Sequence, residues 1–443
     1  MMSLFIILLC IFIMAGPFVF IYFKPYVEGK IEHKKEDWKG IITFWDYPRV
    51  DIVSGSNYGW IVSKIKKFEK ENPGVYIDLK PIGFDSGPIE IETAIRTKTY
   101  PDIAPVGADV GIICQNILEP VDAFFTQEEK QDYKKQALDA VSEHGSIWGF
   151  PCMMSTYTMI LNMDLFNEKG VRPPQNGQWT YSEFVDTLKK LTYDQDGDGH
   201  NDVYGFNSFI GPNDYNIWGI LLSDGAKVFD PNLKYKFYGK SAESGLQKLA
   251  DLKLKYKVTP SDFGENSESK AWKSFCEEKK VAVYPTGTWA INALSKLQQK
   301  GEGFEFEIAK YPIGGKGDSV SVAKITSAYG IFKQEDKEKL QVCVKFLKFL
   351  SQDKYQKELT KIGMFPVKKS VGEIYQDNRF MNRIEKSLED AQNIPMHSNW
   401  VEIEGFIQSQ IRQVLLKDKR VNKALEDAKT KIFMYQKMNN SRP

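Results

Sequence analysis

The sequence predicts an α/β protein of two lobes, preceded by one transmembrane helix. From Gly40 on, strand-like and helix-like segments alternate at short spacing, which is typical of a parallel sheet with crossover helices. The chain has 443 residues, which is too long for one ordinary core, so we expect two lobes. An uncharged apolar stretch before Lys24 indicates the transmembrane helix.

The first element is the apolar stretch from Ser3 to Phe23. At about 1.5 Å per residue it spans about 30 Å, enough to cross a bilayer. No basic residue precedes it, whereas a cleaved signal peptide begins with one. We therefore predict residues 1–24 as a membrane anchor or uncleaved signal, and the charged, aperiodic residues 25–39 as a stalk.

The next elements follow from hydrophobic periodicity. Residues 41–45 form a β-rich apolar run, residues 61–69 have a helical period, and residues 75–79 alternate as a strand. This is a βαβ unit, followed by a strand at 103–106. The pattern recurs as a strand at 281–284, a helix at 288–297 and a strand at 304–308. Residues 403–432 are predicted as helix with basic residues on the outer face.

Composition excludes several classes of protein. Formal net charge is +1, from 59 basic and 58 acidic residues, so the chain lacks the basic field of a nucleic-acid-binding protein. The five cysteines form no C-x-x-C pair, which argues against a zinc knuckle or a disulfide scaffold. Cys343 lies in an apolar helical stretch and is predicted to be a core residue.

Motifs for catalysis are missing from the sequence. The four histidines include no i, i+4 pair, and no G-x-S-x-G elbow occurs. Gly314 to Gly317 lacks the order of a phosphate-binding loop and is predicted to be a turn. Carboxylates are numerous enough to leave a glycosidase open, although no pair stands out by its context.

One loop has the spacing of a calcium site. Asp194, Asp196 and Asp198 occupy positions 1, 3 and 5 of an EF-hand-like loop, with Gly197 and Gly199 between and after them. His200 and Asp202 complete the candidate ligands, but position 12 is Gly205 rather than glutamate. The alternative is a turn rich in Asp and Gly between a helix at 181–191 and a strand. We predict that any Ca²⁺ here is structural and that no other cofactor is required.

Several segments in order resemble the extracellular solute-binding proteins of ABC importers, the family of maltose-binding protein. The longest runs from Asp194 to Phe206, after a helix that begins near Trp179. The others are short and cover nearly everything from Gly40 on: residues 68–74, 101–103, 118–122, 147–151, 161–166, 286–290, 311–317 and 346–350.

The resemblance implies a two-lobed periplasmic-binding-protein fold (type II) with a hinge that the chain crosses three times. We expect an N-terminal lobe at 40–156, completed by 331–350, and a C-terminal lobe at 157–330, completed by 351–443. The crossings are expected near Ser155–Thr158, Ala328–Ile331 and Leu350–Asp353. Solute would bind between the lobes, which close over it by hinge bending.

The resemblance also implies ligand-binding residues. Asp46 and Asp109 are expected to bind sugar hydroxyls from the N-terminal lobe. Trp289 and Trp400 are expected to offer aromatic faces that stack on sugar rings from the other lobe. Tyr215 and Trp218 lie in a stretch where the family often contacts ligand, and Tyr157 lies at the first crossing. For the tryptophans the alternative is ordinary core, and for Asp46 it is a helix cap.

Two departures from the family pattern bear on specificity. The maltose binder has an aromatic residue where this chain has Val106, and an acid where it has Ser155. We therefore do not expect specificity for maltodextrins from the resemblance.

The function implied is capture of a sugar or oligosaccharide for the transmembrane subunits of an ABC permease, by a monomer without enzymatic activity. The alternatives are another solute on the same fold (a polyamine, glycerol phosphate or an acidic oligosaccharide), a glycoside-processing enzyme, and a membrane-tethered sensor for a signalling partner.

The resemblance places the protein at the extracellular face of the cytoplasmic membrane, held by its N-terminal segment. The charges argue the other way: Lys24, Lys30, Lys34 and Lys35 follow the apolar stretch, and the positive-inside rule would leave the domain in the cytoplasm. Large domains are translocated largely regardless of charge, so we expect the exported orientation.

Overall fold

The computed structural model describes residues 38–83, 86–106, 112, 116–143, 145–211, 214–230, 232–315, 320, 323–388 and 399–440. The predicted anchor and nearly all of the stalk lie outside these residues, as does Asp109. Contacts divide the chain into residues 1–40 and 41–443, and the fold below is that of the second unit. Within the described ranges, no helix combines the length and apolarity needed to cross a membrane.

Eight strands form one continuous hydrogen-bonded sheet in the order β2-β1-β3-β10-β6-β8-β7, with β9 also paired to β6. β1 and β3 are parallel, and so are β7 and β8. The predicted parallel sheet is corrected to a mixed one, because β10 and β6 pair antiparallel with their neighbours. The strands are β1 (Gly40–Asp46), β2 (Val75–Pro81), β3 (Ile103–Pro105), β6 (Phe150–Asn162), β7 (Tyr204–Phe206), β8 (Val281–Gly287), β9 (Phe306–Ala309) and β10 (Ala323–Ile331). β4 (Ser142–Glu143) and β5 (Ser146–Ile147) form a separate hairpin.

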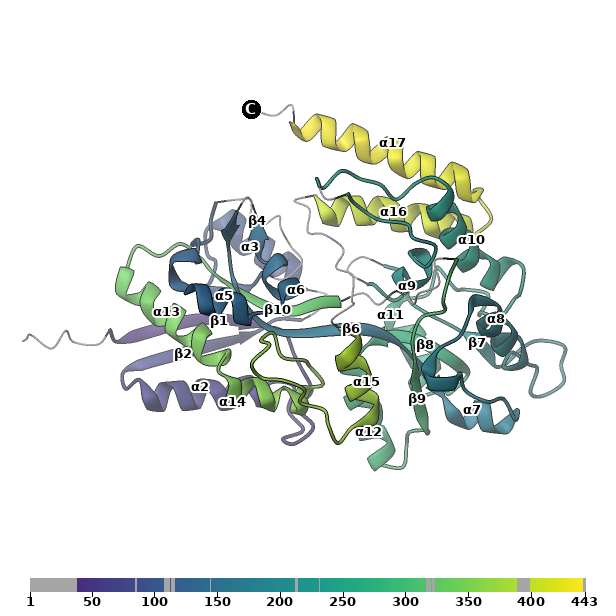
Figure 1. Cartoon of the computed structure of the whole chain (residues 1–443), viewed down its shortest axis with the longest axis horizontal. Coiled ribbons are helices and arrows are strands. Elements are labelled where there is room, and N and C mark those ends of the chain that lie inside the picture. The colour runs from purple at the N-terminus through teal and green to yellow at the C-terminus, as the bar shows by residue number, and fades with distance from the viewer. Residues whose placement is uncertain are drawn as a thin grey trace, which may run out of the picture. The chain divides into compact units, whose positions relative to one another are not determined.

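β6 belongs to both halves of this sheet. Between Phe150 and Thr156 it pairs antiparallel with β10, and from Tyr157 to Asn162 it pairs antiparallel with β8 and β9. All of its residues are buried. The change of partner falls inside the predicted first crossing, and it separates a first lobe around β1, β3 and β10 from a second lobe around β7, β8 and β9 (Figure 1).

The other two crossings differ from the prediction. Tyr329, Gly330 and Ile331 pair with β3, so Ala328–Ile331 lies inside the first-lobe sheet and the chain enters that lobe before β10. The crossing was placed here from the family resemblance, because Lys324, Thr326 and Ser327 interrupt the apolar residues of β10 and no strand was predicted from them.

After α13 (Lys337–Leu350) the chain stays on the first lobe instead of crossing at Leu350–Asp353. Glu358 pairs with Lys64, and Phe365 bridges to Met154. The Lys361 carbonyl accepts from second-lobe Asn292, and α15 (Arg379–Ser387) packs on the second lobe through Phe380 and Phe306. The chain therefore returns to the second lobe between Phe365 and Arg379.

Helices of the first lobe cover its sheet with their apolar faces, and a glycine turn follows the first of them. In α2 (Gly59–Glu71), Ile61, Ile65 and Phe68 are buried, while the lysines between them are mostly exposed. Gly74, at φ +94°, reverses the chain into β2. The other helical segments are α3 (Gly87–Thr97), η1 (Asp122–Phe124), α5 (Gln127–Asp132), α6 (Lys135–Asp139), α13, α14 (Asp353–Gln356) and η3 (Lys357–Ile362).

Aromatic rings join the first-lobe sheet to its helices. Phe44 on β1 packs against Tyr329 on β10 and Phe346 on α13, with ring centroids 5.0 and 5.6 Å apart. Phe68 on α2 packs against Phe346 at 5.1 Å. Such edge-on pairs contribute about 0.5–1.5 kcal/mol each beyond area burial. They fix α2 and α13 on one face of the sheet.

Helices of the second lobe pack around a single large core that includes Trp179, Phe206, Trp218 and Leu249. In α8 (Tyr181–Lys190), Thr180 and Glu183 form a reciprocal capping box that fixes the start of the helix. The other helical segments are α7 (Met163–Glu168), η2 (Gln175–Gly177), α9 (Trp218–Leu221), α10 (Lys240–Leu254), α11 (Glu268–Cys276), α12 (Trp289–Gln299), α15, α16 (Trp400–Leu415) and α17 (Val421–Asn440).

The predicted C-terminal helical region is two helices. α16 ends at Leu415, and Lys417 adopts φ +66° before α17 begins at Val421. The two helices lie side by side in Figure 1 and both contribute to the second-lobe core, through Ile407 and Ala428 among others. The charged run from Lys417 to Arg420 interrupts the apolar period here and was the available signal for the turn.

The described cysteines are buried thiols. Cys152, Cys276 and Cys343 are free and buried, and burial raises the pKa of the Cys343 thiol to about 12. The prediction that Cys343 is a core residue is confirmed.

Gln356 offers a test of the first-lobe packing. Its amide donates to the Cys152 carbonyl at 2.7 Å and accepts from the Val367 amide at 3.0 Å, all buried. We expect Gln356→Ala to lower the free energy of unfolding by about 2–5 kcal/mol, because each buried group left unpaired costs about 1–3 kcal/mol. Urea unfolding measures this. Gln352→Ala, at an exposed glutamine, should change it by less than about 0.5 kcal/mol; equal losses would contradict the argument.

Candidate functional site

Five predicted aromatic residues meet on the second-lobe side of β6. The ring of Tyr157 lies 5.4 Å from Trp289, edge to face, and 5.8 Å from Tyr215. Tyr215 stacks on Trp400 at 6.5 Å, and Trp218 lies 6.1 Å from Trp400. The indole nitrogen of Trp400 donates to the Tyr215 hydroxyl at 2.9 Å. We call these five residues the aromatic cluster.

Trp289 is the member of the aromatic cluster with an exposed face. It is 38% exposed and lies at the first position of α12, directly after β8. Its ring lies over Gly287, where an added Cβ would stand 1.6 Å from the indole. Glycine at 287 therefore lets the indole lie flat against the end of the strand.

The other four members are 0–4% exposed. Trp218 and Trp400 are packed into the second-lobe core, as the alternative interpretation of these tryptophans has it. Phe229 and Tyr215 lie against Trp400, so its predicted stacking face is covered by protein, and Phe237 lies against Trp218. Burial raises the pKa of the Tyr157 and Tyr215 hydroxyls well above the ordinary value, so both stay protonated.

Asp46 belongs to a separate polar network at the carboxyl end of β1. Arg49 Nη1 donates to both Asp46 carboxylate oxygens, at 3.0 and 2.9 Å, and to the Tyr47 carbonyl at 3.0 Å. Arg49 Nη2 donates to the Ser327 hydroxyl. The Tyr329 hydroxyl donates to Asp46 Oδ1 at 3.0 Å. We call Asp46, Arg49, Ser327 and Tyr329 the arginine network.

The arginine network is a charged pair held out of water. Asp46 is fully buried, and the side chain of Arg49 is 8% exposed. Burial raises the pKa of the Asp46 carboxyl, and Arg49 opposes that change. Burial by itself would lower the pKa of the Arg49 guanidinium. The charge of Asp46 outweighs this effect and raises that pKa above its ordinary value. Because arginine does not lose its proton in proteins, the two form an ion pair.

The alternative role of Asp46 as a helix cap is wrong. The residue before α2 is Tyr58, and no side chain caps that helix. Sequence reasoning also missed Arg49, Ser327 and Tyr329. The available signal was local: Tyr47-Pro48-Arg49 after a buried strand is a turn that returns an arginine toward Asp46. Ser327 and Tyr329 gave no signal, because they meet Asp46 and Arg49 only through the sheet.

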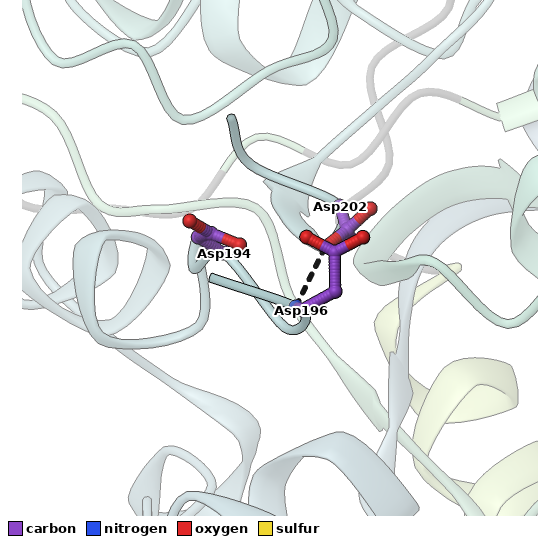
Figure 2. Close-up of side chains that lie close together, drawn as sticks. All are labelled: Asp194, Asp196 and Asp202. Atoms are coloured by element: carbon purple, nitrogen blue, oxygen red, sulfur yellow. Dashed lines mark hydrogen bonds between the residues drawn. The ribbon is translucent and has the colours of Figure 1, made fainter. Parts of the chain in front are cut away.

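The loop predicted for calcium gathers three of its five candidate ligands. Asp194, Asp196 and Asp202 each offer a carboxylate oxygen, and these oxygens lie within 4.8 Å of one another (Figure 2). Asp198 and His200 do not join this group; Asp198 Oδ1 accepts the His200 amide instead, at 2.8 Å. Gly197 and Gly199 have φ of +81° and +91°, conformations that glycine adopts without strain.

Backbone amides organise the loop. The amides of Gly197 and Gly199 donate to the two oxygens of Asp194, both at 2.7 Å, and this lowers the pKa of the Asp194 carboxyl. Asp202 Oδ2 accepts the Gln195 amide at 2.9 Å and the Asp196 amide at 3.3 Å; the latter is the dashed line in Figure 2.

A cavity of about 590 Å³ lies elsewhere, on the first lobe between α2, η1 and α13. Its lining includes Phe68, Val344, Lys345, Lys348 and Phe349, and it shares no residue with the aromatic cluster or the arginine network.

The fold and these sites define a class of protein: two α/β lobes that share a strand, with polar and aromatic groups at the junction and no assembled nucleophile or acid–base pair among them. Residues 64–382 match the family of bacterial extracellular solute-binding proteins, and the chain belongs to this family. Members bind solutes and are not enzymes.

Individual relatives are distant. A binding protein of Brucella abortus is 23% identical over 380 residues, covering 83% of this chain and 87% of that protein. Among solved structures, the ABC substrate-binding protein Lmo0181 of Listeria monocytogenes, in complex with cycloalternan, is similar with a TM-score of 0.75 and 20% identity, covering 90% of this chain and 99% of that one.

T. maritima MalE3 bound to maltose is similar with a TM-score of 0.73 and 20% identity, covering 89% and 99% of the two chains. The predicted periplasmic-binding-protein fold is thereby confirmed.

Asp194 gives a pH-dependent prediction. Its pKa is lowered from the model-peptide value of 3.8 on folding, so the carboxylate stabilises the folded state above that value and stops doing so as the pH falls through the folded pKa. We expect Asp194→Asn to lower Tm at pH 7, and the difference from the wild type to narrow as the pH falls below 3.8, with both proteins in EDTA. Scanning calorimetry across pH measures this. Asp186→Asn, at an exposed aspartate of α8, is the control; the same pH profile for both variants would contradict the loop-specific origin.

Proposed function

We propose that this protein is the solute-binding subunit of an ABC transporter, that its solute is a sugar or oligosaccharide, and that it delivers this solute to the permease. The observation that carries the proposal is the exposed indole of Trp289 at the end of β8, next to the strand that the two lobes share. A flat aromatic face binds the apolar C–H side of a sugar ring.

The arrangement around β6 supports a site between the lobes. In open α/β sheets, ligands bind outside the carboxyl ends of strands, where β1 places Asp46 and β8 leads into Trp289. The relatives named above bind cycloalternan and maltose, both built from sugar rings. A polyamine would need uncompensated carboxylates, whereas Asp46 is neutralised by Arg49. This favours a sugar over the polyamine alternative.

Residues 1–24 are proposed to anchor the domain at the extracellular face of the cytoplasmic membrane, because their apolar stretch is long enough to span a bilayer. The tether would keep a monomeric binder beside the permease. Protease treatment of intact cells tests the orientation, and protection of the domain would contradict it. A tethered sensor would share this topology but would be encoded beside a signalling partner instead of permease subunits.

Trp289 gives the direct test of sugar binding. We expect one or more of maltose, maltotriose and cycloalternan to raise Tm by several degrees, because a solute that binds only the folded state stabilises it. Trp289→Ala should weaken that binding about thirtyfold, since a central aromatic contact contributes about 2 kcal/mol. Thermal shift and titration calorimetry measure the two effects.

Tyr76→Ala is the matched control, because Tyr76 is a 61% exposed aromatic residue on β2, outside the aromatic cluster. It should bind as the wild type does. If no sugar shifts Tm for the wild type, the carbohydrate assignment fails. If Trp289→Ala binds with unchanged affinity, the proposed location of the sugar site is wrong.

We also propose that the loop from Asp194 to Asp202 binds a structural Ca²⁺ through Asp194, Asp196 and Asp202. Two oxygens on one calcium ion, each about 2.3–2.6 Å from it, lie at most about 5 Å apart. The three carboxylate oxygens, within 4.8 Å of one another, meet this limit. The loop joins α8 to β7, so an ion there would stabilise the second lobe.

Calcium binding is tested by titrating CaCl₂ into EDTA-treated protein. We expect Tm to rise with Ca²⁺ and the rise to be lost in Asp196→Asn, while the exposed control Asp186→Asn keeps it. Isothermal titration should give a stoichiometry near one ion per chain. An identical melting curve in EDTA and in millimolar Ca²⁺ would show that the loop is only a turn.

A further inference from the structure

Arg49 and the aromatic cluster share one face of β6. Successive side chains of a strand point to opposite faces, so Met153, Ser155 and Tyr157 point to the same face. Ser327 is the direct cross-strand partner of Met153 and therefore lies on that face too. Since Arg49 donates to Ser327, the arginine network and Tyr157 flank the same stretch of the shared strand.

The separation of the two groups suits a solute of sugar dimensions. Met153 and Tyr157 are four positions apart, which is about 13 Å along a strand at about 3.3 Å per residue. Ser155 lies between them on the same face, and its side chain carries no charge. The first lobe thus contributes a charged group at one end, and the second lobe contributes aromatic rings at the other.

The carboxylate of Asp46 has little hydrogen-bond-accepting capacity left for a solute. Oδ1 accepts from Arg49 Nη1 and from the Tyr329 hydroxyl, and Oδ2 accepts from Arg49 Nη1. Its side chain is fully buried, whereas that of Arg49 retains 8% exposure. A sugar hydroxyl that reached Asp46 would have to displace charge-assisted hydrogen bonds inside the protein, at the cost of leaving Arg49 unpaired.

We propose that Arg49 is the solute-contacting residue of the first lobe and that Asp46 is its positioning residue. The first lobe then offers the solute a hydrogen-bond donor at the place where the sequence predicted an acceptor. Because Asp46 balances the charge of Arg49, the pair favours acceptor oxygens of uncharged solutes, such as hydroxyl, ring or glycosidic oxygens, over solute carboxylates. This inference rests on the proposed sugar-binding function.

The test measures, for the wild type and five variants, Tm and the affinity for whichever of maltose, maltotriose and cycloalternan raises the wild-type Tm most. Arg49→Gln removes the charged donor and should weaken binding at least tenfold, about the value of one hydrogen bond to a charged group. Arg49→Lys keeps the charge but loses the planar guanidinium that donates several hydrogen bonds at once, and it should retain an intermediate affinity. Asp46→Asn should weaken binding because it releases Arg49.

The double variant Asp46→Asn/Arg49→Gln separates the two roles. If Asp46 acts through Arg49, the double variant binds no more weakly than Arg49→Gln alone. It also removes both buried charges together, so it should fold even where a single variant with one unpaired charge unfolds. If the two losses add, Asp46 contacts the solute itself and the inference is overturned.

Lys339→Gln is the matched control. It breaks another first-lobe ion pair, in which Lys339 Nζ lies 2.7 Å from Asp102 Oδ1, and it should lower Tm without changing the affinity. Wild-type affinity in Arg49→Gln would overturn the inference while leaving the proposed function intact. A wild-type protein that binds neither maltotriose nor the other sugars overturns both, and is recognised because it fails before any variant is compared.

Discussion

The fold depends on the hydrogen-bond register of β6, because this strand is a member of both halves of the sheet. Its first part is fixed by pairing with β10, and its second part by pairing with β8 and β9. A slip of one residue would turn every side chain of the strand to the opposite face. Ser327 would then no longer face Met153, and Tyr157 would leave Trp289. Both candidate binding groups are thus set by one register.

The two ends of this site are stabilised in different ways. The aromatic cluster is held by packing, since four of its rings lie inside the second-lobe core and position the exposed indole of Trp289. The arginine network is held by electrostatics, since the guanidinium and the carboxylate compensate each other's burial. Packing of rings varies little with salt or pH, whereas a neutral substitution at only one partner of a buried ion pair destabilises the fold.

Local periodicity predicted the strands of the βαβ patterns and some of the helices, but not β6, β10 or helices such as α3, α10 and α11. β1, α2 and β2, and later β8, α12 and β9, lie where alternation or a helical period placed them, to within two residues at most boundaries. Central strand β10 was not predicted, because Lys324, Thr326 and Ser327 interrupt its apolar residues. The break between α16 and α17 was missed although the charged run from Lys417 to Arg420 interrupts the apolar period.

The candidate site was predictable only in part. The aromatic residues were indicated by the family resemblance, and the structure brings five of them together. The partners of Asp46 were not, because Ser327 is 278 residues from Arg49 in the chain and meets it only through strand pairing. Burial also cannot be derived from residue type: nothing local distinguishes Trp400, 3% exposed, from Trp289, 38% exposed.

The discontinuous path of the chain also sets the order in which the sheet is finished during synthesis. The second-lobe strands are all present once Ala309 has left the ribosome, whereas β10, which separates β3 from β6, ends only at Ile331. The first-lobe half of the sheet, which begins with β1, is therefore completed after the second-lobe half. Until then, β3 and the first part of β6 each present an unpaired apolar edge of the kind that other chains bind. Both edges are closed only when β10 pairs with β3 and β6.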